Sequence, residues 1–197
     1  MNIVSDIVQI IRDNIALHQA VLADENLLDQ IKMISENIIS AIEAGNLVMI
    51  CGNGGSAADA QHMAAELVGR FEKERKGLPV MDLTANAPVI TSLANDYEFN
   101  KVFSRQVESF GKPGDIVIGF STSGNSKNVA EAFRYAREHG IATIGILGRQ
   151  GGIIKDLSDI GLIVPHEVTA RIQEVHATII HVICGAVEIY FAQSSHE

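Results

Sequence analysis

A run of hydroxyl side chains, Ser121-Thr122-Ser123-Gly124-Asn125-Ser126, follows a short apolar segment near the middle of the 197-residue chain. The apolar segment, Ile116–Phe120, predicts a buried strand, and a helical pattern begins near Ser126. Hydroxyls and backbone N–H groups at a helix N-terminus can donate to phosphate oxygens without any full positive charge. The alternative is a polar turn in which Ser126 only caps the helix. So many hydroxyls directly after a buried strand favour a phosphate site.

A second loop, Gly52-Asn53-Gly54-Gly55-Ser56-Ala57, also follows an apolar run and leads into a helix. Its glycines permit tight turns and close approach of the backbone to a ligand. Gly52, Gly54 and Ala57 also match the dinucleotide-binding fingerprint, which expects an acidic residue about 20 positions later, at the end of the second strand. Asp82 lies later than that, and a dinucleotide-dependent oxidoreductase would leave the serine-rich loop without a role.

Several titratable or polar side chains lie on two of the predicted helices. His62 and Glu66 are four positions apart, so they share one face of the helix that begins after Gly55. Gln173 and His181 lie on the last helical pattern of the chain. Taken singly, such residues are commonly surface pairs or core histidines. His176 has no partner pattern, and the remaining histidines are expected on the surface or in loops: His18, His139, His166 and His196.

The framework that must position these residues is predicted from short, continuous apolar runs. Continuous runs suit strands covered on both faces, and helical patterns between them predict parallel pairing with right-handed crossovers. The expected fold is α/β, a three-layer domain with a parallel five-stranded sheet flanked by helices. Both loops then lie at the carboxyl ends of strands, where such sheets bind ligands. The predicted strands are Leu47–Cys51, Val80–Leu83, Ile116–Phe120, Ile141–Leu147 and Ile160–Val164.

Helices are also predicted at both ends of the chain. Apolar residues at helical spacing predict two N-terminal helices with a break at Ala23–Asn26 and an end at Gly45. We expect one domain, residues 1–197, in which the extension 1–45 packs on the domain and at an oligomer interface. The last helix, about Ala170 to Ala192, is apolar almost all round, which indicates burial between subunits.

Composition excludes several classes of protein. The formal net charge of −9 argues against nucleic-acid and anionic-membrane partners. Cys51 and Cys184 lie in apolar runs and are expected to be free, buried thiols, which fits a reducing compartment. No secretory signal is visible, and no apolar run approaches the roughly 20 residues that span a bilayer. The expectation is a cytoplasmic protein.

Taken together, the motifs resemble those of the phosphoheptose isomerases, which have the SIS-type fold. The similarity covers essentially the whole chain. The two loops alone indicate only a sugar-phosphate binder, whereas the His–Glu pair combined with Arg-Ile-Gln-Glu and a later His is specific to a narrower group. The motifs are Gly52–Ser56, Asp59–His62, Glu66–Arg70, Asn95-Asp96, Ser121–Ser126 and Arg171–Glu174.

The resemblance implies an aldose–ketose isomerase that converts sedoheptulose 7-phosphate to D-glycero-D-manno-heptose 7-phosphate through an enediol(ate). This is the first step of heptose synthesis for lipopolysaccharide or related surface glycans. The resemblance also implies a homotetramer with shared active sites and one zinc ion per subunit. Glu66 would be the catalytic base and His181 the acid. The implied metal ligands are His62, Glu66, Gln173 and His181, and the implied substrate contacts are Asn53, Gly54, Gly55, Glu66, Asn95, Asp96, Ser121, Thr122, Ser123, Ser126 and Gln173.

Helix geometry restricts how these ligands can meet. Gln173 and His181 are eight positions apart, which places their Cα atoms about 12 Å apart along a straight helix. Side chains lean toward the helix N-terminus, so Gln173 leans away from His181. We therefore expect the two ligands of one metal to come from different subunits. Glu66 also cannot easily serve as ligand and base at the same moment.

Two related proteins remain as alternatives. One is a non-catalytic SIS protein that binds the bacterial replication initiator and lacks the full catalytic set. The other is an SIS isomerase that acts on shorter or aminated sugar phosphates. The presence of Glu66 and His181 together with Asp59 and His62 favours the enzyme over the binding protein. The His–Glu–Gln–His set and the lack of an accessory domain argue against the second alternative.

Overall fold

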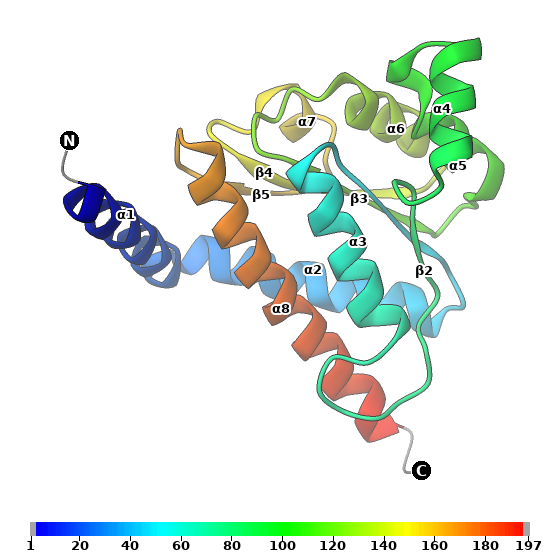
Figure 1. The fold of residues 1–197 in the computed structure, drawn as a ribbon. Coiled ribbons are helices and arrows are strands. Elements are labelled where there is room, and N and C mark those ends of the chain that lie inside the picture. Colours follow the sequence, from blue (N-terminus) through cyan, green and yellow to red (C-terminus); the bar gives the residue numbers. More distant parts are fainter. Residues whose placement is uncertain (1–2, 195–197) are drawn as a thin grey trace.

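Five parallel strands form one sheet in the computed structural model, which describes residues 3–194 (Figure 1). The order across the sheet is β2-β1-β3-β4-β5. All six residues of the central strand β3 are buried, which explains why its sequence is continuously apolar rather than alternating. The five predicted strands are confirmed, with ends that differ by a residue. They are β1 (Val48–Cys51), β2 (Val80–Asp82), β3 (Ile116–Ser121), β4 (Ala142–Gly148) and β5 (Ile160–Val164).

One face of the sheet is covered by α2 (Glu25–Glu43), α3 (Gly55–Val68) and α8 (Thr169–Ser194) (Figure 1). Their apolar side chains share a core with every second strand residue, such as Ile50 and Ile118. The three-layer prediction therefore holds on this side.

The other face carries the helical segments between β2 and β5, and they pack over the alternate strand residues such as Met49 and Val117. The two cores on either side of one sheet complete the predicted α/β architecture. These helices are α4 (Ala87–Asp96), the 3₁₀ turn η1 (Phe99–Lys101), α5 (Ser104–Phe110), α6 (Lys127–Glu138) and α7 (Gly152–Lys155).

Helix α1 (Ile3–Ala23) extends away from the sheet (Figure 1). The break before α2 is where the sequence predicted it, because the Asp24 carboxylate accepts hydrogen bonds from the N–H groups of Asn26 and Leu27. Only Leu17 of α1 is buried, and side chains such as Ile7 and Ile11 are about half exposed. A groove of about 520 Å³ runs between α1, α2 and α8 and is mainly apolar.

Helix α8 combines a buried side with apolar residues that stay exposed, including Val182 and Ile189. It is the one described helix that is long and apolar enough to cross a bilayer, but core helices of water-soluble proteins meet the same criterion. Here α8 packs against α2 and α3. Cys184 of this helix and Cys51 of β1 are free and buried, as expected.

A buried carboxylate fixes the amino-terminal edge of the sheet. Asp115, which is 3% exposed, accepts a hydrogen bond from the N–H of Leu47 at 2.9 Å and another from that of Lys112 at 2.7 Å. These residues precede β1 and β3, so Asp115 aligns the two central strands at the edge opposite the two candidate loops.

Gly119 on β3 lets α6 lie close to the sheet. A Cβ at this position would lie 2.5 Å from Cγ1 of Val129 and 2.8 Å from the Phe133 ring. We expect Gly119→Ala to lower the free energy of unfolding by about 1–3 kcal/mol, since α6 must shift. Urea unfolding at fixed protein concentration measures the loss.

Gly161→Ala on β5 is the matched control, because its nearest neighbour would be an ordinary contact at 3.7 Å. Its effect is expected to stay within about 0.5 kcal/mol. Equal stabilities of the two variants would contradict the proposed role of Gly119.

Candidate active site

The glycine loop and the serine-rich loop lie next to each other at the carboxyl edge of the sheet. They follow the paired strands β1 and β3. From β1 the chain continues through α3 to β2, and from β3 it continues through α6 to β4 on the opposite side. This divergence creates a topological switch point, the usual ligand crevice of an open α/β sheet.

Two amide side chains join these loops. Nδ2 of Asn53 donates to Oδ1 of Asn128 at 2.8 Å, and Nδ2 of Asn128 donates to Oδ1 of Asn53 at 2.7 Å. Asn128 is buried in the first turn of α6. No sequence signal distinguished it from an ordinary polar residue at a helix start. The pair holds Asn53 at the crevice and couples the two loops.

The glycine loop is shaped around its neighbours. Gly54 has a φ of +57°, which favours glycine, and a Cβ on Gly55 would lie 2.2 Å from Nε2 of Gln173. Gln173 therefore covers the first turn of α3. A cavity of about 160 Å³ lies between this loop and the segment from Thr84 to Phe103.

The hydroxyls of the serine-rich loop form contacts within the loop rather than capping the helix. The Oγ atoms of Ser121 and Ser126 are 2.9 Å apart, and Ser126 makes no capping hydrogen bond to α6. Oγ of Ser123 accepts from the N–H of Asn125 at 3.1 Å. Ser126 does occupy the N-cap position of α6, but its hydroxyl does not make the capping hydrogen bond that the polar-turn alternative assigned to it. The first turn of α6 remains suited to an anion.

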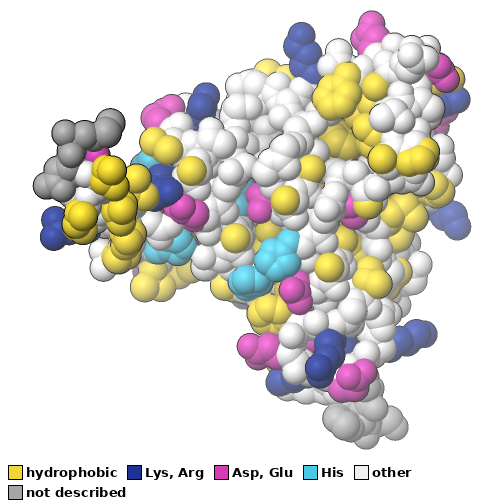
Figure 2. Space-filling view, in the orientation of Figure 1, with side chains coloured by type: hydrophobic (Ala, Val, Ile, Leu, Met, Phe, Trp, Pro, Cys, Tyr) yellow, Lys and Arg dark blue, Asp and Glu magenta, His cyan; other side chains and the backbone are white. Residues whose placement is uncertain are grey.

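A second group of candidate functional side chains gathers where α3 and α8 lie side by side. Nε2 of His62 lies 3.3 Å from Oε1 of Glu66 and 3.1 Å from Nε2 of His181. Figure 2 shows histidine side chains together on this open face, beside an acidic one. The shared helix face of His62 and Glu66 is as predicted, and tertiary packing adds His181 to it.

The three residues fit a zinc ion. Their ligand atoms all lie within 4.8 Å of one another. Ligand atoms bound tetrahedrally at 2.0–2.1 Å from zinc are separated by about 3.3 Å. The two spacings that involve His62, 3.1 and 3.3 Å, match this value, and imidazole nitrogen and carboxylate oxygen are ordinary zinc donors.

Three other predicted site residues lie elsewhere. Gln173 contacts Gly55, which is two turns from His62 on α3, or about 10 Å along the helix axis. Asn95 and Asp96 lie at the exposed end of α4, where Nδ2 of Asn95 donates to Oδ1 of Asp96 at 2.9 Å. Within one chain, these three residues therefore do not join His62, Glu66 and His181 in a single group.

Asp59 lies one turn before His62 on α3 and is half buried. Burial raises the pKa of its carboxyl to about 6, although the nearby His62 works in the opposite direction. Its buried Oδ2 has no hydrogen-bond partner among the described residues. This acid is therefore able to change its charge near neutral pH beside the histidine cluster.

His176 lies in the core, away from this cluster. Its Nε2 donates to the carbonyl of Leu147 at 3.0 Å, and burial lowers its pKa to about 4. It is therefore neutral at physiological pH, and its visible role is to tie α8 to the end of β4. Of the histidines expected on the surface or in loops, His139 is exposed and His18 is partly buried, while His196 lies outside the described residues.

The chain is similar to known proteins over most of its length. A family model described as the SIS domain matches residues 12–148. The chain is 51% identical over 178 residues to the phosphoheptose isomerase of Clostridium acetobutylicum, covering 90% of this chain and 91% of that protein. The solved phosphoheptose isomerases of Neisseria gonorrhoeae and Francisella tularensis match it with TM-scores of 0.88 and 0.92 at 36% and 32% identity. These two alignments cover 95% and 96% of this chain and 100% of each solved chain.

The low pKa of His176 predicts a specific loss of stability in acid. The folded pKa of about 4 lies below the ordinary 6.5, so the unfolded chain binds the extra proton and stability falls as the pH drops from 6.5 toward 4. Between pH 7 and pH 5, this contributes about 2 kcal/mol to the loss of unfolding free energy.

Urea unfolding at both pH values measures the difference. His176→Asn should lose less stability than the wild type over this interval, whereas the exposed control His139→Asn should behave as the wild type does. Identical pH dependence in His176→Asn and wild type would exclude the assignment.

Proposed function

The chain belongs to the phosphoheptose isomerases of the SIS-domain family and is a sugar-phosphate isomerase, and we propose that it converts sedoheptulose 7-phosphate to D-glycero-D-manno-heptose 7-phosphate. The observation that carries the proposal is the approach of the Glu66 carboxylate to His62 and His181. His62 and Glu66 lie on α3, the helix that begins at the switch-point crevice, and His181 lies on the neighbouring α8. A base, an acid and a phosphate loop are what an aldose–ketose exchange needs.

The serine-rich loop supplies the phosphate site of this proposal. The hydroxyls of Ser121, Thr122, Ser123 and Ser126 and the first turn of α6 donate to the phosphate oxygens. Such neutral donors suit a chain with a net charge of −9. The sugar then contacts the glycine loop, Asn53-Gly54-Gly55, together with Asn95, Asp96, Glu66 and Gln173.

The proposed reaction moves two protons. The Glu66 carboxylate removes a proton from C1 of the ketose, next to the C2 carbonyl, and later delivers a proton to C2. His181 takes the proton from the C1 hydroxyl and gives one to the C2 oxygen. C1 becomes the carbonyl carbon and C2 the alcohol carbon, so no net proton or electron is gained or lost. The intermediate is the enediol(ate).

We assign one zinc ion per subunit to His62, Glu66 and His181, with Gln173 as a fourth ligand. When bound, zinc polarises the substrate carbonyl and lowers the barrier to proton removal. One carboxylate cannot easily bind the metal and accept the substrate proton at once, so the ligand and base roles of Glu66 belong to different parts of the cycle.

A homotetramer with shared sites is part of this proposal. Within its own chain, Gln173 contacts Gly55 rather than the histidine cluster, which supports a fourth ligand from another subunit. The exposed apolar side chains of α1 and the apolar groove beside α8 support subunit contact by the extension 1–45 and the last helix. The buried free thiols support a cytoplasmic location, with the product feeding surface-glycan synthesis.

Two alternatives are less well supported. A non-catalytic protein that binds the replication initiator has no need of the gathered cluster of His62, Glu66 and His181. One observation favours the dinucleotide alternative, because Asp82 is the last residue of β2, where the fingerprint expects an acidic residue. However, Oδ1 of Asp82 already accepts hydrogen bonds from the N–H and hydroxyl of Thr84.

Turnover of sedoheptulose 7-phosphate by the purified protein tests the proposal. Glu66→Gln and His181→Ala are each expected to lower kcat by about 10²–10⁴-fold, because each removes one proton-transfer group. Glu108→Gln, in an exposed ion pair with Arg105, is the matched control and should retain wild-type kcat. A chelator followed by added zinc tests the metal requirement. No turnover by an intact oligomer with added zinc would favour the non-catalytic alternative.

The phosphate loop makes a separate prediction. Ser126→Ala should raise KM about tenfold with little change in kcat, because one hydrogen bond to a charged phosphate is lost. Ser109→Ala, whose hydroxyl donates to the Arg105 carbonyl on α5, serves as the control. An unchanged KM in Ser126→Ala would remove this residue from the phosphate site.

A further inference from the structure

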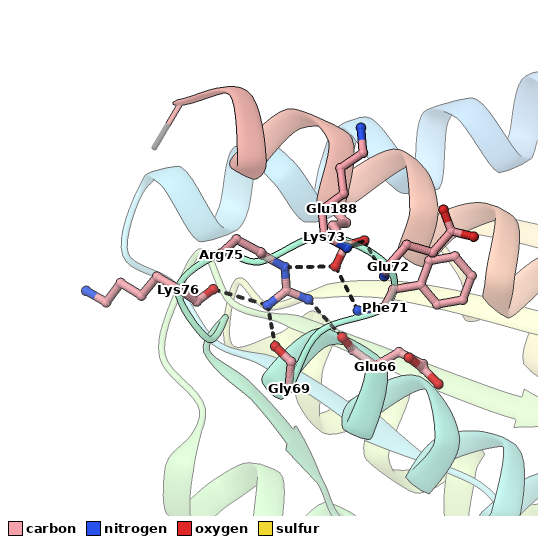
Figure 3. A network of polar contacts seen from close by, with 8 residues as sticks. All are labelled: Glu66, Gly69, Phe71, Glu72, Lys73, Arg75, Lys76 and Glu188. Carbon is pink, nitrogen blue, oxygen red and sulfur yellow. Dashed lines mark hydrogen bonds and ion pairs between the residues drawn. The ribbon is translucent and has the colours of Figure 1, made fainter. Parts of the chain in front are cut away.

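The loop that follows α3 is held against α8 by one buried carboxylate (Figure 3). Glu188 of α8 accepts hydrogen bonds from three consecutive N–H groups, those of Phe71 at 2.7 Å, Glu72 at 2.6 Å and Lys73 at 2.8 Å. The contact joins residues 117 positions apart in the sequence. The contact therefore fixes the loop after α3 to a helix that is distant from it in the sequence.

Arg75 completes this network from the other side (Figure 3). Nη2 donates to the carbonyl of Glu66 at 2.8 Å, and Nη1 donates to the carbonyls of Gly69 at 2.9 Å and Lys76 at 3.1 Å. Nε lies 3.6 Å from Oε1 of Glu188. The guanidinium thus satisfies carbonyls at the C-terminal end of α3, where helical partners run out and positive charge is favourable.

The pair is almost fully removed from water, with side-chain exposures of 0% for Arg75 and 2% for Glu188. Burial alone would raise the pKa of Glu188. The three N–H donors and Arg75 outweigh it and hold this pKa below its ordinary value. A buried ion pair is stable only when its hydrogen-bonding groups are well satisfied. Well-packed apolar residues in its place often give a protein equal or greater stability. A role beyond stability is therefore worth testing.

Both proposed proton-transfer residues contact this network. Arg75 binds the backbone carbonyl of Glu66, whose carboxylate belongs to the histidine cluster. The ring of Phe71, whose N–H is held by Glu188, lies 5.5 Å from the ring of His181. The network therefore reaches Glu66 through its main chain and His181 through a neighbouring ring.

We propose that Arg75 and Glu188 are positioning residues for the isomerisation, which set the Glu66 carboxylate opposite His181 by fixing the end of α3 to α8. This rests on the proposed roles of Glu66 and His181. Among the described residues, neither Arg75 nor Glu188 has a hydrogen bond or ion pair to the serine-rich loop or the glycine loop, which lie at the carboxyl edge of the sheet. Loss of the pair should therefore impair proton transfer more than substrate binding.

Glu188→Gln and Arg75→Lys test the proposal in the full-length protein. Glu188→Gln removes the charge, and Arg75→Lys keeps the charge but loses the planar set of donors. Asp115→Asn is the matched control, because Asp115 is also a buried carboxylate bonded to backbone N–H groups, at the opposite edge of the sheet. Steady-state kinetics with sedoheptulose 7-phosphate are measured where circular dichroism shows each variant to be folded.

We expect kcat of both network variants to fall by at least about tenfold, with KM within about threefold of wild type, as for a displacement of catalytic groups. Asp115→Asn should lose thermal stability but keep kcat within about twofold. A folded Arg75→Lys or Glu188→Gln with wild-type kcat overturns the proposal. So does a loss of kcat in Asp115→Asn that matches theirs, since that result indicates a general effect of instability.

Failure of the proposed function gives a different result, namely a wild-type protein that does not turn over sedoheptulose 7-phosphate. In that case, crystal structures of wild type and Glu188→Gln decide the matter without turnover. The spacing of the His62, Glu66 and His181 side chains is expected to widen in the variant. An unchanged spacing overturns the positioning role whatever the substrate is.

Discussion

The packing of α3 against α8 is the contact on which the candidate site depends. Met63 and Leu67 of α3 are fully buried in the same core as Ile180 and Ile183 of α8. This apolar contact brings the adjoining side of α3, with His62 and Glu66, next to His181. The hydrophobic effect supplies most of the association energy but little angular precision, since it is not directional. The directional bonds are polar: Asn53 to Asn128 near the start of α3, and Arg75 to the Glu66 carbonyl near its end.

The same fold explains how an acidic chain can bind an anionic substrate. Parallel strands deliver two loops and two helix N-termini to one edge, so partial positive charges from backbone N–H groups converge there. Neutral hydroxyls add hydrogen-bond donors for the anion, so the site needs no cluster of basic side chains in a chain whose net charge is −9. The proposed catalytic groups, His62, Glu66 and His181, lie further along α3 and on α8. In the proposed function, phosphate recognition at the start of α6 and proton transfer between α3 and α8 therefore occupy separate parts of the structure.

Much of this organisation could be predicted from local patterns, and the rest depends on tertiary contacts. Continuous apolar runs identified the strands, and i,i+4 spacing placed His62 and Glu66 together. Helix geometry also predicted that Gln173 and His181 of one chain lie apart. The contact of Gln173 with Gly55 could not be predicted, because it depends on how α8 crosses α3. The burial of Arg75 and Glu188 could not be predicted, because isolated charged residues normally lie on the solvated surface. Their burial follows from a pairing over more than a hundred positions, which no periodicity encodes.

The way Glu188 binds its loop has a consequence for how the sequence can diverge. Apart from its ion pair with Arg75, its carboxylate contacts main-chain N–H groups, and the side chains of Glu72 and Lys73 are exposed. Natural variation at these two positions is therefore nearly unconstrained by the contact, with one exception. Proline lacks the N–H group and would abolish the bond. Divergent relatives that retain this contact should therefore vary widely at positions 72 and 73 and lack only proline there. A comparison of identities at each position would score these two positions as unimportant.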